Sequence, residues 1–488
     1  MRVYSIPSAQ PFLRLVARAI LDGFPLTGGS RPGPGDLPNW TILVPTRRAA
    51  HELERTFYEE GGGIARLMPR IRPLGDVDED IFGAEPGFSA AELDLPPAIT
   101  PVGRDLALIA LIGEWAAENP HIRLAQEISG SAHQLQALAT SLARFIDGLE
   151  IEEIGFDRIP ELFGLESAGH REAILDFLAL ARVKLPALLH QWRMIGPMER
   201  RSRLLRLEAR RLAEHPPSWP VIAAGSTGSI PATRALLKSI AGLPMGAVVL
   251  PGLDTHMSEA DWMGVGPQHP QYILKLLLAD FGVAPGDVAE FPGAGSAPRD
   301  WLASEIMRPA ETAEAWRETV TGKREAIRDA LAGVELVEAR SRREEALAIA
   351  LILRHALESP EKTAALITPD RELARRVKAE LARWAIEIDD SAGEPLIRFA
   401  GAALVNLVLD AALTDFPALA LNALFSDALC HFGMEPDAAR KASRAIEIAL
   451  FRNGYNERGI TGIAAAVRHC RSRSAADNHV HPLVRNLA

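Results

Sequence analysis

Thr46, Arg47 and Arg48 have residue types and a placement that suit phosphate binding. They follow the apolar run 42–44, which predicts a short strand of a parallel sheet, and Pro45 predicts its end. Thr46 can cap a following helix. Open α/β sheets bind ligands outside the carboxyl ends of their strands, where hydroxyl, guanidinium and backbone N–H groups can bond phosphate oxygens. We therefore predict that these three residues contact a nucleic-acid backbone.

A second set of candidate contacts lies in the segment 225–231, which follows a predicted strand and precedes a predicted helix. Ser226, Thr227 and Ser229 can hold a phosphate through backbone amides at the helix start, or they can simply form a capped turn. Tyr272, near the start of another predicted helix, is either a stacking platform for a base or a packing residue. Both alternatives stay open for each group.

The loop after the first predicted strand is where a nucleotide-binding P-loop would lie. A P-loop needs the pattern G-x-x-x-x-G-K-S/T, because glycine amides wrap the phosphates and the lysine reaches the outer ones. This loop has neither glycine nor lysine, and Pro7 and Pro11 remove two backbone donors. Ser8 and Gln10 mark a degenerate nucleotide site, with Ser8 predicted to cap a helix that starts near Ala9. We do not expect ATP turnover here.

Several other groups could carry chemistry but are better explained by structural roles. Asp254 ends a predicted strand and is expected to cap the next turn rather than act as a catalytic or metal-binding carboxylate. Two clusters have spacings that fit a charged loop and a chance grouping better than metal sites. These clusters are Asp76, Asp78, Glu79 and Asp80, and His469, Cys470, His479 and His481. Neither catalytic nor metal-binding residues are predicted.

The composition fits a globular protein without a membrane span. The chain has 488 residues, enough for about three domains, with 48% apolar and 24% charged residues. No apolar run is long enough for a membrane span and the N-terminus lacks a secretory pattern, so the cytoplasm is expected. Cys430 and Cys470 are too few for a disulfide framework. The net charge of −10 means that any contact with DNA must come from local arginine patches.

Six stretches, in one order along the chain, resemble the AddB family, whose members are the second subunit of the bacterial AddAB break-repair helicase-nuclease. The run WTILVPTRRAAHELERTF (40–57) also resembles the superfamily 1 helicase motif that contacts single-stranded DNA. The other stretches are SIPSAQPFL (5–13), AAGSTGSIPATRALL (223–237), VVLPGLD (248–254), HPQYILKLLL (269–278) and RREEALAIALILRHAL (342–357). The family's C-terminal region carries a nuclease domain and an iron–sulfur cluster held by four cysteines. This chain has two cysteines, so neither feature is assigned to it.

Hydrophobic periodicity predicts two α/β units and two helical blocks. Strands are expected at 3–6, 41–44, 220–224 and 246–250 in the first unit, and at 334–339 and 364–368 in the second, with helices at 342–357 and 370–384. Segment 283–300 lacks periodicity and predicts a linker or exposed loop. The resemblance implies how these parts nest: two RecA-like parallel-sheet lobes, as in superfamily 1 helicases, each with a helical insertion.

The expected domains follow from this nesting. A discontinuous first lobe takes 1–102 and 215–285, around a helical insertion at 103–214. A linker with helices takes 286–332, the second lobe takes 333–395, and the start of a second insertion, truncated relative to the family, takes 396–488.

The resulting functional hypothesis is an inactivated helicase-like, DNA-binding subunit of an AddAB-type complex. Such a complex processes double-strand break ends for homologous recombination, and its AddA-type partner would supply ATP- and Mg²⁺-dependent motion. Two alternatives stay open. The chain could be an α/β nucleotide-dependent enzyme with a pocket near Asp254 and Ser226, or a scaffold that docks a partner without touching DNA.

Overall fold

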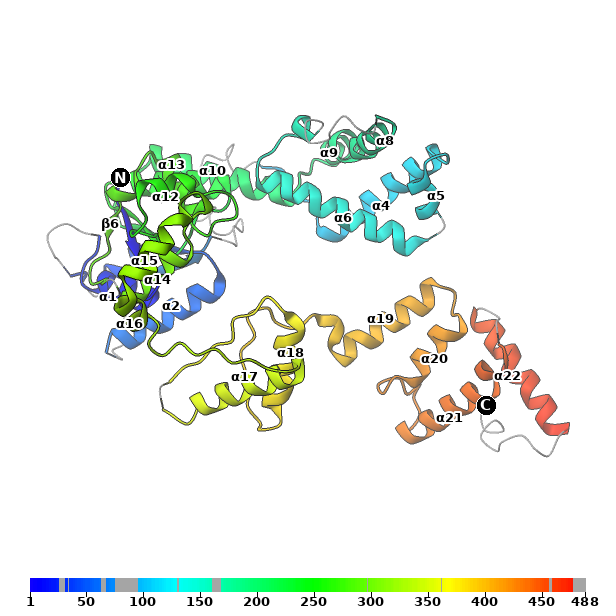
Figure 1. Cartoon of the computed structure of the whole chain (residues 1–488). Helices are drawn as coiled ribbons and strands as arrows, with labels where there is room; N and C mark the ends of the chain where they lie inside the picture. Colours follow the sequence, from blue (N-terminus) through cyan, green and yellow to red (C-terminus); the bar gives the residue numbers. More distant parts are fainter. Residues whose placement is uncertain are drawn as a thin grey trace. The chain divides into compact units, whose positions relative to one another are not determined.

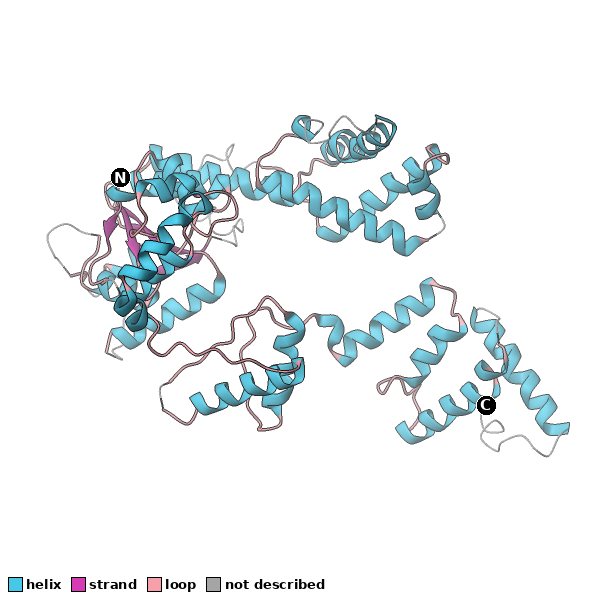
Figure 2. Ribbon diagram, viewed as in Figure 1, coloured by secondary structure: helices cyan, strands magenta, loops and turns pink. Residues whose placement is uncertain are grey.

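The computed structural model describes residues 1–25, 31–33, 35–62, 67–74, 95–129, 131–159, 168–295, 297–360, 362–455 and 459–476. The chain divides into two compact units, Met1–Val334 and Glu335–Ala488. Helices and strands are labelled in Figure 1, and Figure 2 separates the strands from the surrounding helices. Among the described residues, no helix combines the length and apolarity that crossing a membrane would require.

The first unit contains a six-stranded, all-parallel sheet, so the predicted α/β class is confirmed. Its strand order is β3-β2-β4-β5-β1-β6. The strands are β1 (Val3–Ile6), β2 (Thr41–Val44), β3 (Arg70–Pro73), β4 (Val221–Ala224), β5 (Gly246–Pro251) and β6 (Ala289–Glu290). The four strands predicted for this unit therefore form within a residue of their expected bounds. β4, which lies in the middle of the sheet, is buried at all four of its positions, as expected where helices cover both faces.

Helices cover the two faces of the sheet in separate layers. α1 (Phe12–Leu21) and α2 (Arg47–Glu60) pack on one face with Ile222 and Ala224. α10 (Pro197–Glu214), α11 (Pro231–Gly242) and α13 (Tyr272–Phe281) pack on the other face with Val221 and Ala223. Successive residues of a strand point to opposite faces, so each apolar strand supplies both cores. A short helix, α12 (Glu259–Gly264), precedes α13.

The predicted helical insertion forms between β3 and β4. It consists of α4 (Pro101–Glu118), α5 (Arg123–Ser129), α6 (Ala132–Ile151), α8 (Ala168–Ala179), a π-helical turn (Leu180–Lys184), α9 (Leu185–Gln191) and the first half of α10. Apart from α10, these helices share an apolar core of their own, in which Trp115 is 3% exposed. Arg104 on α4 and Asp147 on α6 form a paired guanidinium–carboxylate contact of 2.9 Å (Nη2 to Oδ2). α10 packs against both α6 and α11 and so links the insertion to the sheet.

Segment 283–300 is largely exposed, as its composition predicted, but it is tied to the sheet rather than being a free linker. It contributes β6, which pairs with β1, and Phe291 is buried at 1% exposure. The Phe291 ring meets Tyr4 and Phe24 in edge-on contacts with centroids 6.2 and 4.8 Å away. One strand pair and one aromatic anchor suffice to fix a segment that lacks periodicity. Helices α14 (Pro298–Ile306), α15 (Trp316–Gly322) and α16 (Arg324–Ala330) follow it.

The elements that the structure describes in the second unit are all helices. It contains α17 (Arg342–Ala356), α18 (Arg371–Ala382), α19 (Ala400–Leu413), α20 (Ala418–Ser426), α21 (Pro436–Ala449) and α22 (Gly459–Ala476). α17 and α18 match the predicted helices and share a small core around Ala350 and Val377. The strands predicted at 334–339 and 364–368 do not form. Within the described residues neither segment pairs with another strand, and Leu336 and Ile367 are 87% and 94% exposed. A second RecA-like lobe is therefore not confirmed.

Candidate nucleic-acid site at the sheet edge

The sheet has two places where the chain reverses its direction of travel across the strands. Connections from β1 and β2 run toward the β3 edge, whereas connections from β4 and β5 run toward the β6 edge. Neighbouring strands with opposite connections meet at β2/β4 and at β1/β5. In open α/β sheets, the usual ligand site is the crevice between such strands at their carboxyl ends, because right-handed crossovers place the two sets of helices on opposite faces. These two places are the expected ligand sites of the fold.

At the β2/β4 crevice, the structure brings together most of the predicted nucleic-acid contacts. β2 and β4 pair in register, with Leu43 opposite Ala223, so Thr46–Arg48 and Ser226–Ser229 leave the same edge on neighbouring strands. A side-chain carbon added at Gly225 would lie 3.3 Å from the Phe12 ring and 3.5 Å from Pro45, so these turns touch. The two predicted sets therefore form one candidate site.

The α2 side of this site projects into solvent. The predicted cap is confirmed, because the Ala49 N–H donates to Thr46 Oγ1 at 3.1 Å. Arg47 and Arg48 occupy the first two helical positions, and Thr46, Arg47 and Arg48 are all exposed. The N-terminus of a helix carries partial positive charge from its unpaired amides. Two guanidinium groups therefore add to the field of the helix at one exposed point, which suits a polyanion.

The β4 side combines a buried turn with exposed amides. Ser226 is 9% exposed and its Oγ accepts the Gly228 N–H at 3.3 Å, which is the predicted turn role. Within the described residues, the backbone N–H groups of Thr227 and Ser229 have no protein acceptor, and Ser229 is exposed. Arg234, which the sequence analysis missed, bonds the carbonyl oxygens of Gly228 and Ser229 at 3.2 and 3.3 Å. The carbonyls are thus held on α11, while two amides of the same loop remain available for an anion.

The β1/β5 crevice contains the degenerate nucleotide site, and protein groups fill it. The Ala9 N–H donates to the Asp300 carboxylate at 3.2 Å, and the Gln10 side-chain amide donates to the Gly295 carbonyl at 2.7 Å. Ser8 does not cap the helix, which begins instead at Phe12 with Pro11 before it. The Ser8 hydroxyl lies 2.5 Å from the position that a side-chain carbon at Gly252 would take. The remaining cavity of about 110 Å³ is too small for a nucleotide.

The residues at this crevice therefore do not fit ATP. The Asp300 carboxylate accepts the loop amide of Ala9 and so takes the place that a phosphate would have in a P-loop. The loop also has no lysine to pair with a phosphate. Asp254 plays the predicted capping role, since its Oδ1 accepts the His256 N–H at 2.9 Å. Asp300 was not found from the sequence because it lies 291 positions from Ala9 and no local pattern indicates that contact.

Within the described residues, no contact joins Tyr272 to the β2/β4 site, and most of the metal candidates lie outside those residues. Tyr272 is the first residue of α13 and is partly buried, and no recorded contact joins it to Thr46–Arg48 or to Ser226–Ser229. The acidic cluster 76–80 lies outside the described residues, as do His479, His481 and the side chain of Cys470. Within the part of the chain that the structure describes, no group of His, Cys, Asp and Glu is arranged to hold a metal ion.

Neither a scan against protein-family models nor a search of curated proteins finds a match to this chain.

Proposed function

We propose that this chain is an inactivated helicase-like, DNA-binding subunit of an AddAB-type complex that processes double-strand break ends for homologous recombination. Two things support the proposal: the resemblance of the ordered sequence stretches to the AddB family, and the β2/β4 crevice. That crevice gathers Thr46, Arg47, Arg48, Thr227 and Ser229 at the carboxyl edge of one parallel sheet. It is the observation on which the proposal mainly rests.

The charge distribution favours a localised phosphate contact. With a net charge of −10, most of the surface repels a polyanion, so binding must be concentrated where positive groups gather. Arg47 and Arg48 gather such charge at the start of α2, and the amides of Thr227 and Ser229 provide neutral donors beside it. Phosphate contacts of this kind carry no sequence information, so we expect binding without strong base preference.

The filled β1/β5 crevice supports the proposed loss of motor activity. Asp300, Gln10 and Ser8 occupy it with contacts inside the protein, so ATP- and Mg²⁺-driven motion would come from an AddA-type partner in the cytoplasm. In this arrangement the chain holds the strand while the partner moves it.

The test is a titration of fluorescently labelled single-stranded and duplex DNA with the full chain, alone and together with an AddA-type subunit. We expect salt-dependent binding of the single strand, and no ATP hydrolysis by the chain alone. Measurable ATP turnover by the chain alone would favour a nucleotide-dependent enzyme. Absence of DNA binding in both the presence and the absence of the partner would refute the proposal.

A partner-docking scaffold is the second candidate, because the second unit exposes many large apolar side chains. Leu336, Ile367 and Leu413 are 87%, 94% and 86% exposed, whereas large apolar side chains in such numbers are usually covered. Stable binding of the AddA-type subunit without any DNA affinity would select this function instead.

A further inference from the structure

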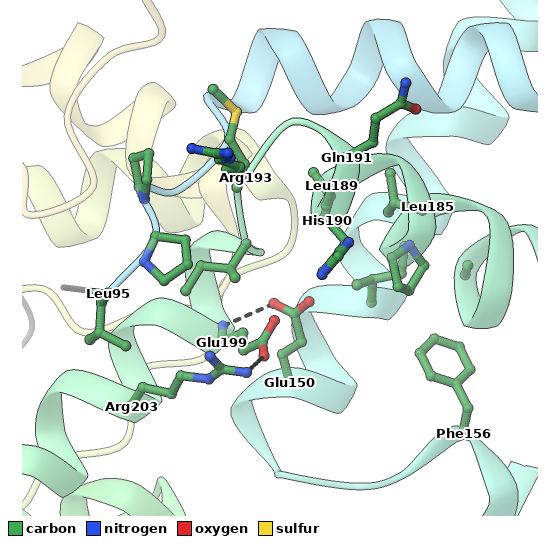
Figure 3. A pocket seen from close by; sticks show the side chains of 17 residues that line it. Leu95, Glu150, Phe156, Leu185, Leu189, His190, Gln191, Arg193, Glu199 and Arg203 are labelled. Atoms are coloured by element: carbon green, nitrogen blue, oxygen red, sulfur yellow. Dashed lines mark hydrogen bonds and ion pairs between the residues drawn. The ribbon is translucent and has the colours of Figure 1, made fainter.

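A cavity of about 1000 Å³ lies in the helical insertion, away from both crevices of the sheet. Its walls come from α6, α9, the first turns of α10 and the segment before α4 (Figure 3). This volume is at the upper end of the range for small-molecule sites, which are lined mainly by apolar side chains with a few polar groups.

The cavity has an apolar wall and an acidic wall. Phe156, Leu185 and Leu189 line the apolar wall, and Leu185 and Leu189 belong to the core of the insertion. Glu150 and Glu199 lie on the opposite wall, and the Glu150 carboxylate faces the cavity (Figure 3). A ligand that fills this space would therefore meet apolar surface on one side and carboxylate oxygen on the other.

The Glu150 carboxylate is held firmly from one side. Its Oε2 accepts the backbone N–H of Glu199 at 3.0 Å, at the start of α10. Its other oxygen lies against Gly196, where any side-chain carbon would collide with the carboxylate. The hydrogen bond to Glu199 and the contact with Gly196 together fix the direction in which the Glu150 carboxylate points.

Two of the nearby cations are already engaged with other carboxylates, and Arg193, which also lines the cavity, is exposed. Arg104 pairs with Asp147, and Arg203 pairs with Glu199. Within the described residues, no cation forms an ion pair with Glu150. Burial, together with the charges of Glu199 and Asp147, raises the pKa of Glu150 to about 7, although the Glu199 N–H and Arg104 act in the opposite direction. An incoming cation would supply the counter-charge that this carboxylate lacks.

We propose that this cavity binds an organic cation, in which an ammonium or amidinium group bonds Glu150 and an apolar body packs against Phe156, Leu185 and Leu189. A bare metal ion fits less well, because Mg²⁺ and Ca²⁺ require several oxygen ligands and one wall of this cavity is apolar. The site is independent of the β2/β4 crevice and of the DNA-binding proposal.

Binding is expected to depend on pH, because Glu150 must be ionised to pair with a cation. With a pKa near 7, the ionised fraction rises by about tenfold between pH 6 and pH 8, so the affinity should rise by the same factor. The other titratable or charged groups facing this region are Arg104, Asp147, Glu153, His190, Arg193, Glu199, Arg203 and Arg206. His190 also lines the cavity, so the variant experiment must separate its contribution from that of Glu150.

The test uses p-aminobenzamidine, an aromatic amidinium whose fluorescence increases in apolar surroundings, titrated into the full chain. The neutral analogue p-aminobenzamide is the ligand control. We expect saturable binding of the cation and at least about tenfold weaker binding of the amide, since a charge-assisted hydrogen bond is lost. Failure of the cation to saturate at millimolar concentration, or equal affinity for the two compounds, would overturn the proposal.

The decisive variant is Glu150→Gln, which keeps an oxygen acceptor for the Glu199 N–H and removes the charge. It should weaken cation binding at pH 8 by about tenfold or more and abolish the pH dependence. Glu153→Gln is the matched control, because Glu153 lies three residues after Glu150, just past the end of α6, does not line the cavity, and pairs with Arg206. Unchanged binding in Glu150→Gln, or a pH dependence that persists there, would exclude Glu150 as the cation site.

Discussion

The double substitution Arg47→Ala/Arg48→Ala tests whether the start of α2 contacts nucleic-acid phosphate. Each phosphate contact with a single strand lowers the slope of log K against log salt by about 0.7, so removing two should flatten it by about 1.4. At about 0.1 M salt this corresponds to about 25-fold weaker binding, falling to about tenfold at 0.2 M. Fluorescence anisotropy of a labelled single strand, titrated at several salt concentrations, measures both quantities.

The position of these arginines separates an effect on binding from an effect on folding. Cations in the first turn of a helix interact unfavourably with its dipole by about 0.3–1 kcal/mol each, so their removal should not weaken α2 through that term. Thermal unfolding of the variant checks this. Arg440→Ala/Lys441→Ala, on exposed α21, removes the same charge and should leave the salt slope nearly unchanged. If both double variants shift the slope equally, or if neither does, Arg47 and Arg48 are not phosphate contacts.

Three further predictions concern the elements around these sites. Thr46→Ala should lower the free energy of unfolding by about 1 kcal/mol, because the Ala49 N–H loses its cap, and Thr46→Ser should restore most of it in a urea titration. Asp300→Ala should lower this free energy by about 1–3 kcal/mol, because two backbone N–H groups lose their acceptor, yet nucleotide binding in a filter assay should stay absent because the loop still lacks a lysine. The stability difference between Glu150→Gln and wild type should shift in favour of the variant as the pH rises from about 4.5 to 7. The folded-state pKa of Glu150 is raised, so its contribution to wild-type stability is complete below the unfolded pKa and is lost through pH 7; a difference that does not vary with pH in urea titrations would contradict this.

Local pattern was enough to predict the elements at the candidate site. The apolar run at 41–44, the proline after it and Thr46 at the helix start each act over a few residues, so the strand, its end and the helix cap are all confirmed. The same holds for α17, which begins after Ser341, whose hydroxyl accepts the Glu344 N–H at 3.2 Å. These features depend on neighbours in sequence.

Features that depend on distant partners were predicted less well. Phe291 and the two-residue strand β6 lie in a segment without periodicity, and only pairing with β1 and contact with Tyr4 and Phe24 place them. The segments 334–339 and 364–368 show the opposite error, because strands were predicted there and do not form. Their apolar and β-branched residues favour strands, but a strand forms only where another backbone accepts and donates its hydrogen bonds. Pairing cannot be read from either segment alone.

The two crevices of the sheet have opposite chemical character, and this contrast underlies the proposed function. Both lie at carboxyl ends of parallel strands where connections reverse, so the fold offers each as a ligand site. At β1/β5, the Asp300 carboxylate bonds a loop amide that an anion would otherwise use, and like charge repels any phosphate that approaches. At β2/β4, exposed guanidinium groups and free amides attract the same anion. A polyphosphate ligand is therefore excluded from one crevice and favoured at the other, which is the property expected of a subunit that holds DNA without consuming ATP.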